Sequence, residues 1–160
     1  MVRLNMESLT LLTRRLVPEM VARGRGGVLN VASTAAFLPG PLMTVYYATK
    51  AYVVSFSEAL REELRGTGVA VTCLCPGPVR TGFQARAGMV LPSTFRLAET
   101  DGPSVARAGV EGLLRDRTLV IPGVMNRLVT FLPRVLPRRI VPRIVMRAQG
   151  RRTSGDGKAG

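Results

Sequence analysis

The spacing of apolar residues predicts helices and strands in alternation along the chain. A helical period runs through residues 5–23, where four large apolar side chains recur three or four positions apart. These side chains are Leu9, Leu12, Leu16 and Met20. Two continuous apolar runs, Gly27–Val31 and Gly68–Leu74, are typical of strands buried on both faces of a parallel sheet. Residues 43–66 lie between the two runs and predict a long helix that ends at Gly66.

The downstream part of the chain continues this alternation. Residues 104–115 predict a helix, and Thr118–Ile121 predicts a short strand. Residues 82–102 contain Pro92 and Gly102 and predict a variable loop region. Strands that alternate with helices in this way indicate an α/β fold with a parallel sheet.

Tyr46 and Lys50 are the first candidate catalytic pair. Residues four apart share a face of a helix, so the Lys50 ammonium would lie beside the Tyr46 phenol. A nearby ammonium favours the phenolate, which makes a tyrosine a proton donor and acceptor near neutral pH. Lys50 is one of only two lysines in an arginine-rich chain, which suggests a site that needs a compact ammonium. The alternative is a core tyrosine and a solvated lysine on an ordinary helix.

Ser33 and the segment Cys75–Thr81 place small and polar residues at the ends of the two apolar runs. Ser33 closely follows the first run, and Cys75–Thr81 follows the second. In open α/β sheets, ligands bind in the crevice at the carboxyl ends of the strands. We therefore expect both sites to converge there with the helix that carries Tyr46.

These motifs together resemble the C-terminal part of the short-chain dehydrogenase/reductase (SDR) family. The resemblance covers residues 1–123 and rests on a helix-opening asparagine, an Asn-Val-Ala-Ser run, a Tyr-x-x-x-Lys pair, and a Pro-Gly pair followed by threonine. The corresponding residues here are Asn5, Asn30–Ser33, Tyr46, Lys50, Pro76, Gly77 and Thr81. The resemblance implies an α/β fold with a Rossmann-like three-layer parallel sheet, truncated to its C-terminal half.

The resemblance also implies a role for each of these residues. Tyr46 would be the general acid in carbonyl reduction and the base in alcohol oxidation, while Lys50 would stabilise its phenolate and bind the nicotinamide ribose. Ser33 would orient the substrate oxygen, and Asn5 would hold a water that relays protons to Lys50. The residues implied to contact the cofactor, NAD or NADP, are Tyr46, Lys50, Pro76, Gly77, Val79 and Thr81.

Three of these residues have simpler alternative explanations. Ser33 could end a strand or cap a helix, and Thr81 could cap the next short helix. Asn5 could be an ordinary residue at the start of a helix.

A glycine-rich turn that would hold the cofactor pyrophosphate at a helix N-terminus is absent from this sequence. Gly24–Gly27 precedes a strand instead of following one, so it reads as a helix-to-strand loop. The residue that selects NAD or NADP would lie in the same absent part, and we favour NADP only slightly. A misplaced start codon, a truncated or decayed gene, and a natural short protein are the competing explanations, of which we expect the first.

Residues 124–149 form a basic amphipathic segment. No acidic residue occurs between Asp116 and Asp156, and prolines at positions 133, 137 and 142 predict a series of short helices. The segment is too charged to span a bilayer. It is either a solvated arginine face over a core-packing face or a surface that contacts an anionic membrane. No nucleic-acid-binding motif and no interleaved aromatic residues accompany the charge, so we expect no nucleic-acid partner. Residues 150–160 are typical of a disordered tail.

Composition narrows the class of protein further. The six arginines of the basic segment, with Arg151 and Arg152 after it, account for most of the net charge of +13. The absence of histidine excludes His-based triads and His-metal sites, so we expect no metal. Cys73 and Cys75 alternate along a predicted strand and do not indicate a disulfide scaffold. No leader peptide is evident after Met1. These features predict a bacterial-type protein that is cytoplasmic or peripheral to the membrane.

We expect an oxidoreductase that transfers a hydride between NAD(P)(H) and a small carbonyl or secondary alcohol, with a lipid-like substrate as one option. The resemblance implies a homodimer or tetramer built through the helices at residues 5–23 and 43–66, and a substrate lid in residues 82–102. The alternative function is a catalytically silent, truncated family member that acts as an interaction or membrane-surface protein. Cofactor binding separates the two.

The isolated chain is expected to be marginally stable or to aggregate. In a whole SDR sheet the strand near residues 27–32 would pair on both sides, and here one edge would be bare, which invites association. Thermal unfolding followed by circular dichroism and light scattering tests this expectation. A sharp, reversible transition of a monomer would contradict it.

Overall fold

A computed structural model describes residues 1–79 and 100–150 of the chain. Thr81, most of the expected lid and the tail after Gly150 lie outside these described residues. The centre of the molecule is a parallel sheet of β1 (Gly26–Val31), β2 (Val69–Leu74) and β3 (Leu119–Val120), in the order β1-β2-β3. The strands form where the apolar runs predicted them, although β3 is only two residues long.

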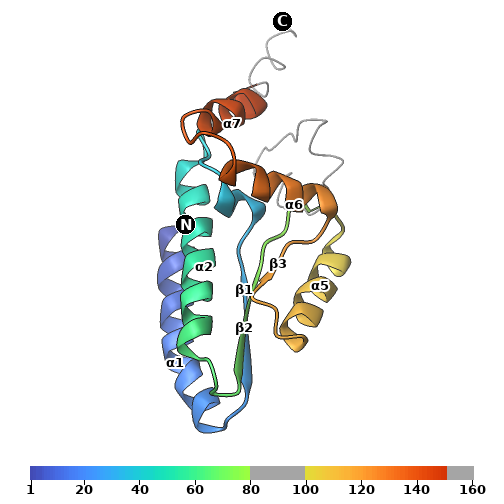
Figure 1. Cartoon of the computed structure of the whole chain (residues 1–160). Coiled ribbons are helices and arrows are strands. Elements are labelled where there is room, and N and C mark those ends of the chain that lie inside the picture. Colours follow the sequence, from blue (N-terminus) through green and yellow to red (C-terminus); the bar gives the residue numbers. More distant parts are fainter. Residues whose placement is uncertain (80–99, 151–160) are drawn as a thin grey trace, which may run out of the picture.

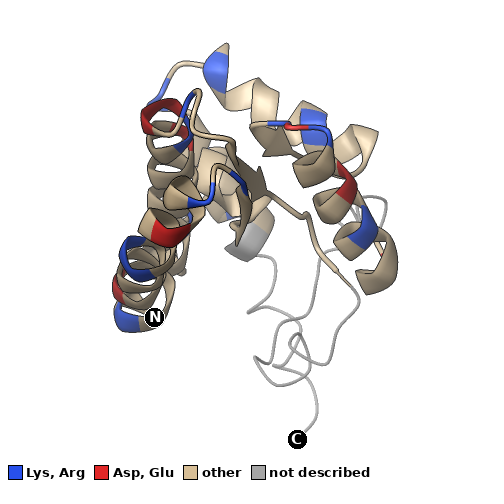
Figure 2. Ribbon diagram, turned by 90° about the horizontal axis from the view of Figure 1, so that it is seen from below, with Lys and Arg blue, Asp and Glu red and all other residues tan. Residues whose placement is uncertain are grey.

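Helices cover both faces of this sheet (Figure 1). Helices α1 (Ser8–Ala22) and α2 (Thr44–Glu63) lie on one face, and α5 (Gly102–Leu114) lies on the other. Basic and acidic positions are interspersed along these three helices (Figure 2). The arrangement is the Rossmann-like three-layer sheet that the sequence predicted.

Glycines allow the helices to approach the sheet closely on both faces. A Cβ atom on Gly26 of β1 would lie 2.6 Å from Cβ of Met20 on α1. A Cβ atom on Gly109 of α5 would lie 2.8 Å from Cδ2 of Leu74 on β2. Both separations are too short for carbon atoms, so these positions require glycine for the observed helix–sheet distance.

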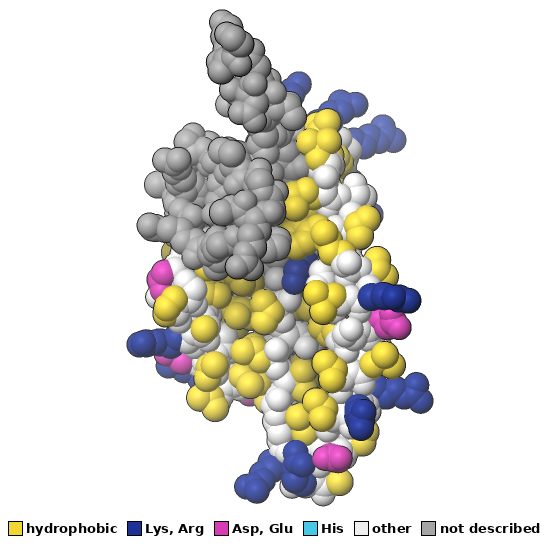
Figure 3. Space-filling view, turned by 180° about the vertical axis from the view of Figure 1, so that it is seen from behind, with side chains coloured by type: hydrophobic (Ala, Val, Ile, Leu, Met, Phe, Trp, Pro, Cys, Tyr) yellow, Lys and Arg dark blue, Asp and Glu magenta, His cyan; other side chains and the backbone are white. Residues whose placement is uncertain are grey.

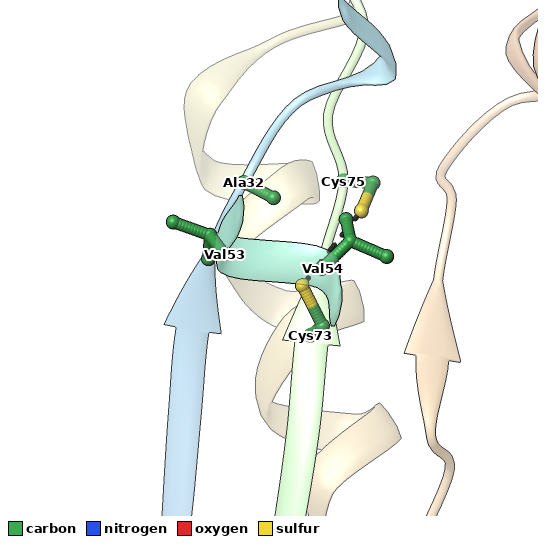
Figure 4. Close-up of a cluster of buried hydrophobic side chains, with 5 residues drawn as sticks. All are labelled: Ala32, Val53, Val54, Cys73 and Cys75. Atoms are coloured by element: carbon green, nitrogen blue, oxygen red, sulfur yellow. Dashed lines mark hydrogen bonds between the residues drawn. The ribbon is translucent and has the colours of Figure 1, made fainter. Parts of the chain in front are cut away.

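The core beside the strand ends is a cluster of small side chains from β1, β2 and α2 (Figure 4). Its buried members are Ala32, Val53, Val54, Cys73 and Cys75. Residues two apart on a strand point to the same face, so both thiols enter this cluster. Their sulfur atoms are 3.9 Å apart, and both cysteines are free and fully buried.

The first helix differs from the prediction at its start and in its buried face. It begins with a π-helical turn, η1 (Arg3–Glu7), so Asn5 lies within the helix, where its backbone N–H donates to the Met1 carbonyl at 2.8 Å. Thr13 and Val17 are the buried residues of α1, whereas Leu12 and Leu16 are 58% and 48% exposed. The apolar face expected from the periodicity is therefore only partly covered by the rest of the described residues. Thr13 is tolerated in the interface because its hydroxyl donates to the Leu9 carbonyl.

Two other helix boundaries were also predicted inaccurately. Helix α2 ends at Glu63, before a turn in which Gly66 has a φ of +81°, instead of continuing to Gly66. Helix α5 begins at Gly102, because the Asp101 carboxylate accepts a hydrogen bond from the Ser104 N–H at 2.9 Å and so caps the helix. This cap was not predicted from the sequence.

The C-terminal segment lies over the carboxyl ends of the strands (Figure 1). It consists of α6 (Val124–Phe131), the 3-10 helix η3 (Leu132–Arg134) and α7 (Val141–Gly150). Pro142 does not separate two helices as predicted. It lies in the first turn of α7, where a missing N–H costs no intrahelical hydrogen bond. None of the described helices combines the length and apolar character needed to cross a bilayer.

The outer edge of β1 pairs with no other strand in the described part of the chain. Seen from behind, backbone atoms run down this face with hydrophobic side chains on both sides (Figure 3). Val31 on this strand is 52% exposed. The bare edge predicted from the sequence is therefore present among these residues.

At the opposite end of the strands, Arg61 joins α2 to the turn after α5. Its guanidinium contacts both carboxylate oxygens of Asp116, at 2.6 and 2.8 Å, and also donates to the backbone carbonyls of Asp116 and Val71. Bidentate pairs of this kind are stronger than single charged hydrogen bonds. The Arg61 hydrogen bond lowers the pKa of Asp116 from its ordinary value. This pair links helices on opposite faces of the sheet.

Replacing Arg61 with methionine should reduce the free energy of unfolding by about 1–2 kcal/mol, after allowance for the solvent that screens exposed Asp116. Because the folded-state pKa of Asp116 is depressed, its contribution is present above 3.8, the ordinary aspartate value, and is lost as the pH falls through the lower folded value. The difference between wild type and Arg61→Met should therefore shrink in acid. Urea unfolding at several pH values measures it. Arg65→Met, which removes an exposed pair with Glu62, is the control and should change stability by less than about 0.5 kcal/mol.

Candidate active site

Ser33 lies where β1 ends, against the segment that leaves β2. The ladder between the strands continues beyond them, since Ala32 N–H donates to Leu74 and Thr34 N–H donates to Pro76, both at 2.8 Å. Ser33 Oγ accepts from Ala35 N–H at 3.2 Å and donates to the Pro76 carbonyl at 3.4 Å. The two strand ends therefore meet, as predicted. Ser33 also caps the 3-10 helix η2 (Thr34–Phe37), so the capping alternative describes part of its role.

Tyr46 and Lys50 lie one turn apart near the start of α2. The Lys50 Nζ is 6.0 Å from the centroid of the Tyr46 ring, and both side chains are half-buried. Nζ donates a hydrogen bond to the Val31 carbonyl at 3.0 Å, which fixes the ammonium at the carboxyl end of β1. Burial lowers the pKa of Lys50 from its ordinary value. The lysine is therefore anchored two residues before Ser33 along the chain.

Asn5 joins this group through Thr49. Its Nδ2 donates to Thr49 Oγ1 at 3.1 Å, and Thr49 Oγ1 donates to the Tyr46 carbonyl at 2.8 Å. Thr49 is almost fully buried and immediately precedes Lys50. A chain of hydrogen bonds thus connects η1 to the turn of α2 that carries Tyr46 and Lys50. Thr49 was not predicted as a site residue, although its position between the candidates Tyr46 and Lys50 was a usable signal.

The segment after β2 continues from Pro76 to Val79, which is the last described residue before position 100. Val79 forms a parallel bridge with Thr100, and the Thr100 N–H donates to the Pro78 carbonyl at 3.1 Å. Gly77 packs against the carboxamide of Asn126, which is 3% exposed. Thr81 lies outside the described residues.

Asn126 is a site residue that the sequence analysis missed. Its Nδ2 donates to the Pro122 carbonyl at 2.7 Å, and a Cβ atom on Gly77 would overlap its carboxamide. Asn126 therefore holds α6 against the Pro76–Val79 segment. A single polar residue in the otherwise apolar and basic start of α6 was the only signal in the sequence, and that signal does not say which residue it contacts.

The two core thiols below the site are not candidate nucleophiles. The hydrogen bond shared by the two thiols, together with burial, raises the pKa of Cys75, whereas the same hydrogen bond lowers the pKa of Cys73. Both side chains are fully buried, so neither sulfur is accessible to a substrate. Their contribution is to fill the space between the strand ends and α2.

The structure therefore brings Ser33 together with Pro76, and Asn5 together with the helical turn of Tyr46 and Lys50. Within the described ranges it shows no hydrogen bond between Ser33 and Tyr46. The residues occupy the carboxyl end of the sheet, where open α/β folds bind their ligands. They supply a phenol, an ammonium and a hydroxyl, which are the groups needed for proton transfer to a substrate oxygen.

Comparison with known proteins identifies the family of this chain. The family model described as short chain dehydrogenase matches residues 1–89. This chain belongs to the short-chain dehydrogenase family. It is similar to the human very-long-chain 3-oxoacyl-CoA reductase, with 42% identity over 145 residues that cover 88% of this chain and 44% of the relative. It is also similar to the ketoacyl reductase HetN of Nostoc sp., with 39% identity over 112 residues that cover 69% of this chain and 38% of the relative.

Solved structures of the same family share the fold. The short-chain dehydrogenase from Sphingobium yanoikuyae in complex with NADPH matches with a TM-score of 0.69 and 26% identity, covering 99% of this chain and 57% of that one. A 7beta-hydroxysteroid dehydrogenase matches with a TM-score of 0.73 and 23% identity, covering 91% of this chain and 57% of that one. This short-chain dehydrogenase chain spans less than half the length of the curated relatives named here.

Gly77→Ala should lower the free energy of unfolding by about 1–3 kcal/mol, because the added Cβ overlaps the buried Asn126 carboxamide. Gly102→Ala is the matched control, since its Cβ would enter open space. In an Asn126→Ala background the effect of Gly77→Ala should become smaller, because the two changes are coupled through one contact. Chemical denaturation of the four variants measures this coupling. Equal effects in both backgrounds would contradict the contact.

Proposed function

We propose that this chain carries the catalytic part of an NAD(P)-dependent oxidoreductase that acts on a carbonyl or a secondary alcohol. The observation that supports the proposal most directly is the convergence of Ser33, at the Pro76 carbonyl, with the anchored pair Tyr46 and Lys50 at one end of the sheet. Asn5 supports that pair through Thr49.

The residues at this end fit the nicotinamide half of such a cofactor. An ammonium has three donors, and Lys50 directs one of them to the Val31 carbonyl. Two donors remain for hydroxyl groups such as those of a ribose. Pro76, Gly77 and Val79 line the same end, and we include Thr81 from the family motif although it lies outside the described residues. When bound, the nicotinamide supplies or accepts the hydride.

In the reductive direction, Tyr46 would donate its phenolic proton to the substrate oxygen as negative charge develops there. The Lys50 ammonium would stabilise the resulting phenolate. Ser33 Oγ donates to the Pro76 carbonyl over 3.4 Å, which is a weak bond, so turning its hydroxyl toward a substrate oxygen would cost little. Asn5 and Thr49 would hold the Tyr46 turn in position, and Asn5 would orient a water that returns a proton toward Lys50. In the oxidative direction Tyr46 would act as the base.

The relatives suggest the cofactor and the substrate class. Two solved relatives contain NADPH or NADP, which favours NADP over NAD for this chain. Several curated relatives are named as 3-oxoacyl-CoA or ketoacyl reductases. We therefore propose a carbonyl on a lipid-like small molecule as the substrate, in a cytoplasmic protein.

The outer face of α1 supports the proposal of a homodimer or tetramer. Leu11, Leu12 and Leu16 are all about half exposed or more on this helix. A run of exposed leucines beside α2 is a self-complementary surface that a second copy would bury. In this proposal residues 1–123 form the SDR domain, and residues 124–149 form a separate basic extension.

Tyr46→Phe should lower turnover of NADPH with a carbonyl substrate by about 100- to 10,000-fold, since it removes the proton donor and keeps the ring. Lys50→Met should cause a loss of similar order, because it removes the charge that stabilises the phenolate. Steady-state rates with an acyl ketone substrate measure both changes. The protein used should have the length that its source cells make. Unchanged turnover in both variants would contradict the assignment.

Tyr52→Phe is the matched control for these variants. It removes a phenol from the same helix whose partner is the Thr10 hydroxyl at 2.6 Å, so it should affect stability and leave turnover within about threefold. Direct titration with NADPH and NADH separates the enzyme from the silent alternative. If neither dinucleotide binds the folded protein, the oxidoreductase proposal is wrong and the interaction protein remains.

A further inference from the structure

Helix α6 has its polar and apolar faces reversed relative to a helix that packs on a core. Its buried residues are Asn126 and Thr130, at 3% and 4% exposure. Its large apolar residues Val124, Leu128 and Phe131 are 74%, 58% and 57% exposed. Local hydrogen bonds make the reversal tolerable, since Asn126 donates to Pro122 and Thr130 donates to Arg127. The hydrophobic effect gives no reason for this orientation unless another apolar phase covers the outer face.

The exposed apolar surface continues through η3 and α7. Nine large hydrophobic residues between positions 124 and 148 are exposed, and only Val141 among the large apolar residues of this stretch is buried. The nine are Val124, Met125, Leu128, Phe131, Leu132, Val135, Ile140, Ile144 and Met146. A patch of this extent, at one end of a molecule, marks an interaction surface. The core-packing alternative for this segment is therefore wrong for most of its apolar residues.

The charges of the same segment are all positive. Six arginines are interspersed with the nine apolar residues, and the sequence has no acidic residue between Asp116 and Asp156. The arginines are Arg127, Arg134, Arg138, Arg139, Arg143 and Arg147. In the space-filling view, basic and hydrophobic side chains gather together at the end of the molecule where α7 lies (Figure 3). This differs from α1, α2 and α5, where both signs are mixed (Figure 2).

We propose that residues 124–148, the basic docking surface, bind the interface of an anionic lipid bilayer. The apolar side chains of α6, η3 and α7 enter the headgroup region, and the arginines contact lipid phosphates. Charge decides between this partner and a second copy of the chain, because two copies of this surface would bring twelve like charges together. An anionic bilayer supplies both the apolar phase and the opposite charge.

Docking in this way places the candidate active site next to the membrane. Asn126 packs on Gly77, so α6 links the docking surface to the segment after β2. If the proposed function also holds, a lipid-like substrate could pass from the bilayer to the site without crossing bulk water. The docking itself requires neither cofactor nor substrate, so its failure is distinguishable from a failure of the oxidoreductase proposal.

Vesicle flotation of the full 160-residue chain tests the docking. The protein should float with vesicles of phosphatidylcholine and phosphatidylglycerol and should remain unbound with phosphatidylcholine alone. Flotation is preferable to sedimentation because aggregated protein sinks. A triple variant should partition more weakly into anionic vesicles, by about fivefold for each arginine removed. Its substitutions are Arg138→Gln, Arg139→Gln and Arg143→Gln. The control, Arg14→Gln, Arg15→Gln and Arg107→Gln, removes the same charge from α1 and α5 and should leave most of the binding.

The chain contains no tryptophan, so a single introduced tryptophan reports on insertion. Emission of Phe131→Trp should shift to shorter wavelength with anionic vesicles, whereas Leu114→Trp, an 81% exposed position on α5, should not shift. Each of four outcomes would overturn the proposal. The protein could fail to float with anionic vesicles, or it could bind equally to both vesicle types. The two triple arginine variants could lose binding equally, or the emission could shift at both introduced tryptophans. If the protein does not float and Phe131→Ser changes the mass of its oligomer in solution, this face is a contact between copies of the chain instead.

Discussion

The parallel pairing of β1 with β2, continued past both strand ends, is the constraint on which the rest of this molecule depends. The ladder runs from Gly26 and Val69 to Val31 and Leu74, and two further backbone hydrogen bonds carry it to Pro76. Because the strands are parallel, the segments that follow β1 and β2 leave the sheet at the same end. Ser33 and the Pro76–Val79 segment therefore start from adjacent points, and their separation is set by backbone hydrogen bonds and not by side-chain packing alone.

Helix α2 transfers this order to Tyr46 and Lys50. Its inward residues Val53 and Val54 pack on the core cluster, and Lys50 bonds to the last carbonyl of β1. The turn between Tyr46 and Lys50 carries Thr49, which accepts a hydrogen bond from Asn5 of η1. The ammonium is thus held by β1, and the helical turn that carries the phenol is held through Thr49. Proton-transfer groups need this kind of support, because small errors in position are costly in rate.

Besides the outer face of α1, the same fold leaves the outer edge of β1 and the outer face of α6 without partners among the described residues. The outer edge of β1 exposes backbone groups that a neighbouring strand would satisfy. The outer face of α6 exposes apolar side chains although its polar residues are buried. The two surfaces differ in chemistry, since the first offers hydrogen-bond donors and acceptors and the second offers hydrocarbon and positive charge. Different partners therefore suit them.

The sequence by itself determined the α/β class, the parallel strands and the likeness to short-chain dehydrogenases, because continuous apolar runs, residue spacing and motif order are local properties of the chain. It also placed Ser33 and Pro76 just after their strands, and Tyr46 and Lys50 in the first half of their helix. Only the tertiary structure decided which face of α1 is buried, that Asn126 rests on Gly77, that Thr49 connects Asn5 to Tyr46, and that α6 turns its apolar side outward. Each of these depends on contacts between residues far apart in the chain, and helical periodicity gives the spacing of a face but not the direction in which that face points.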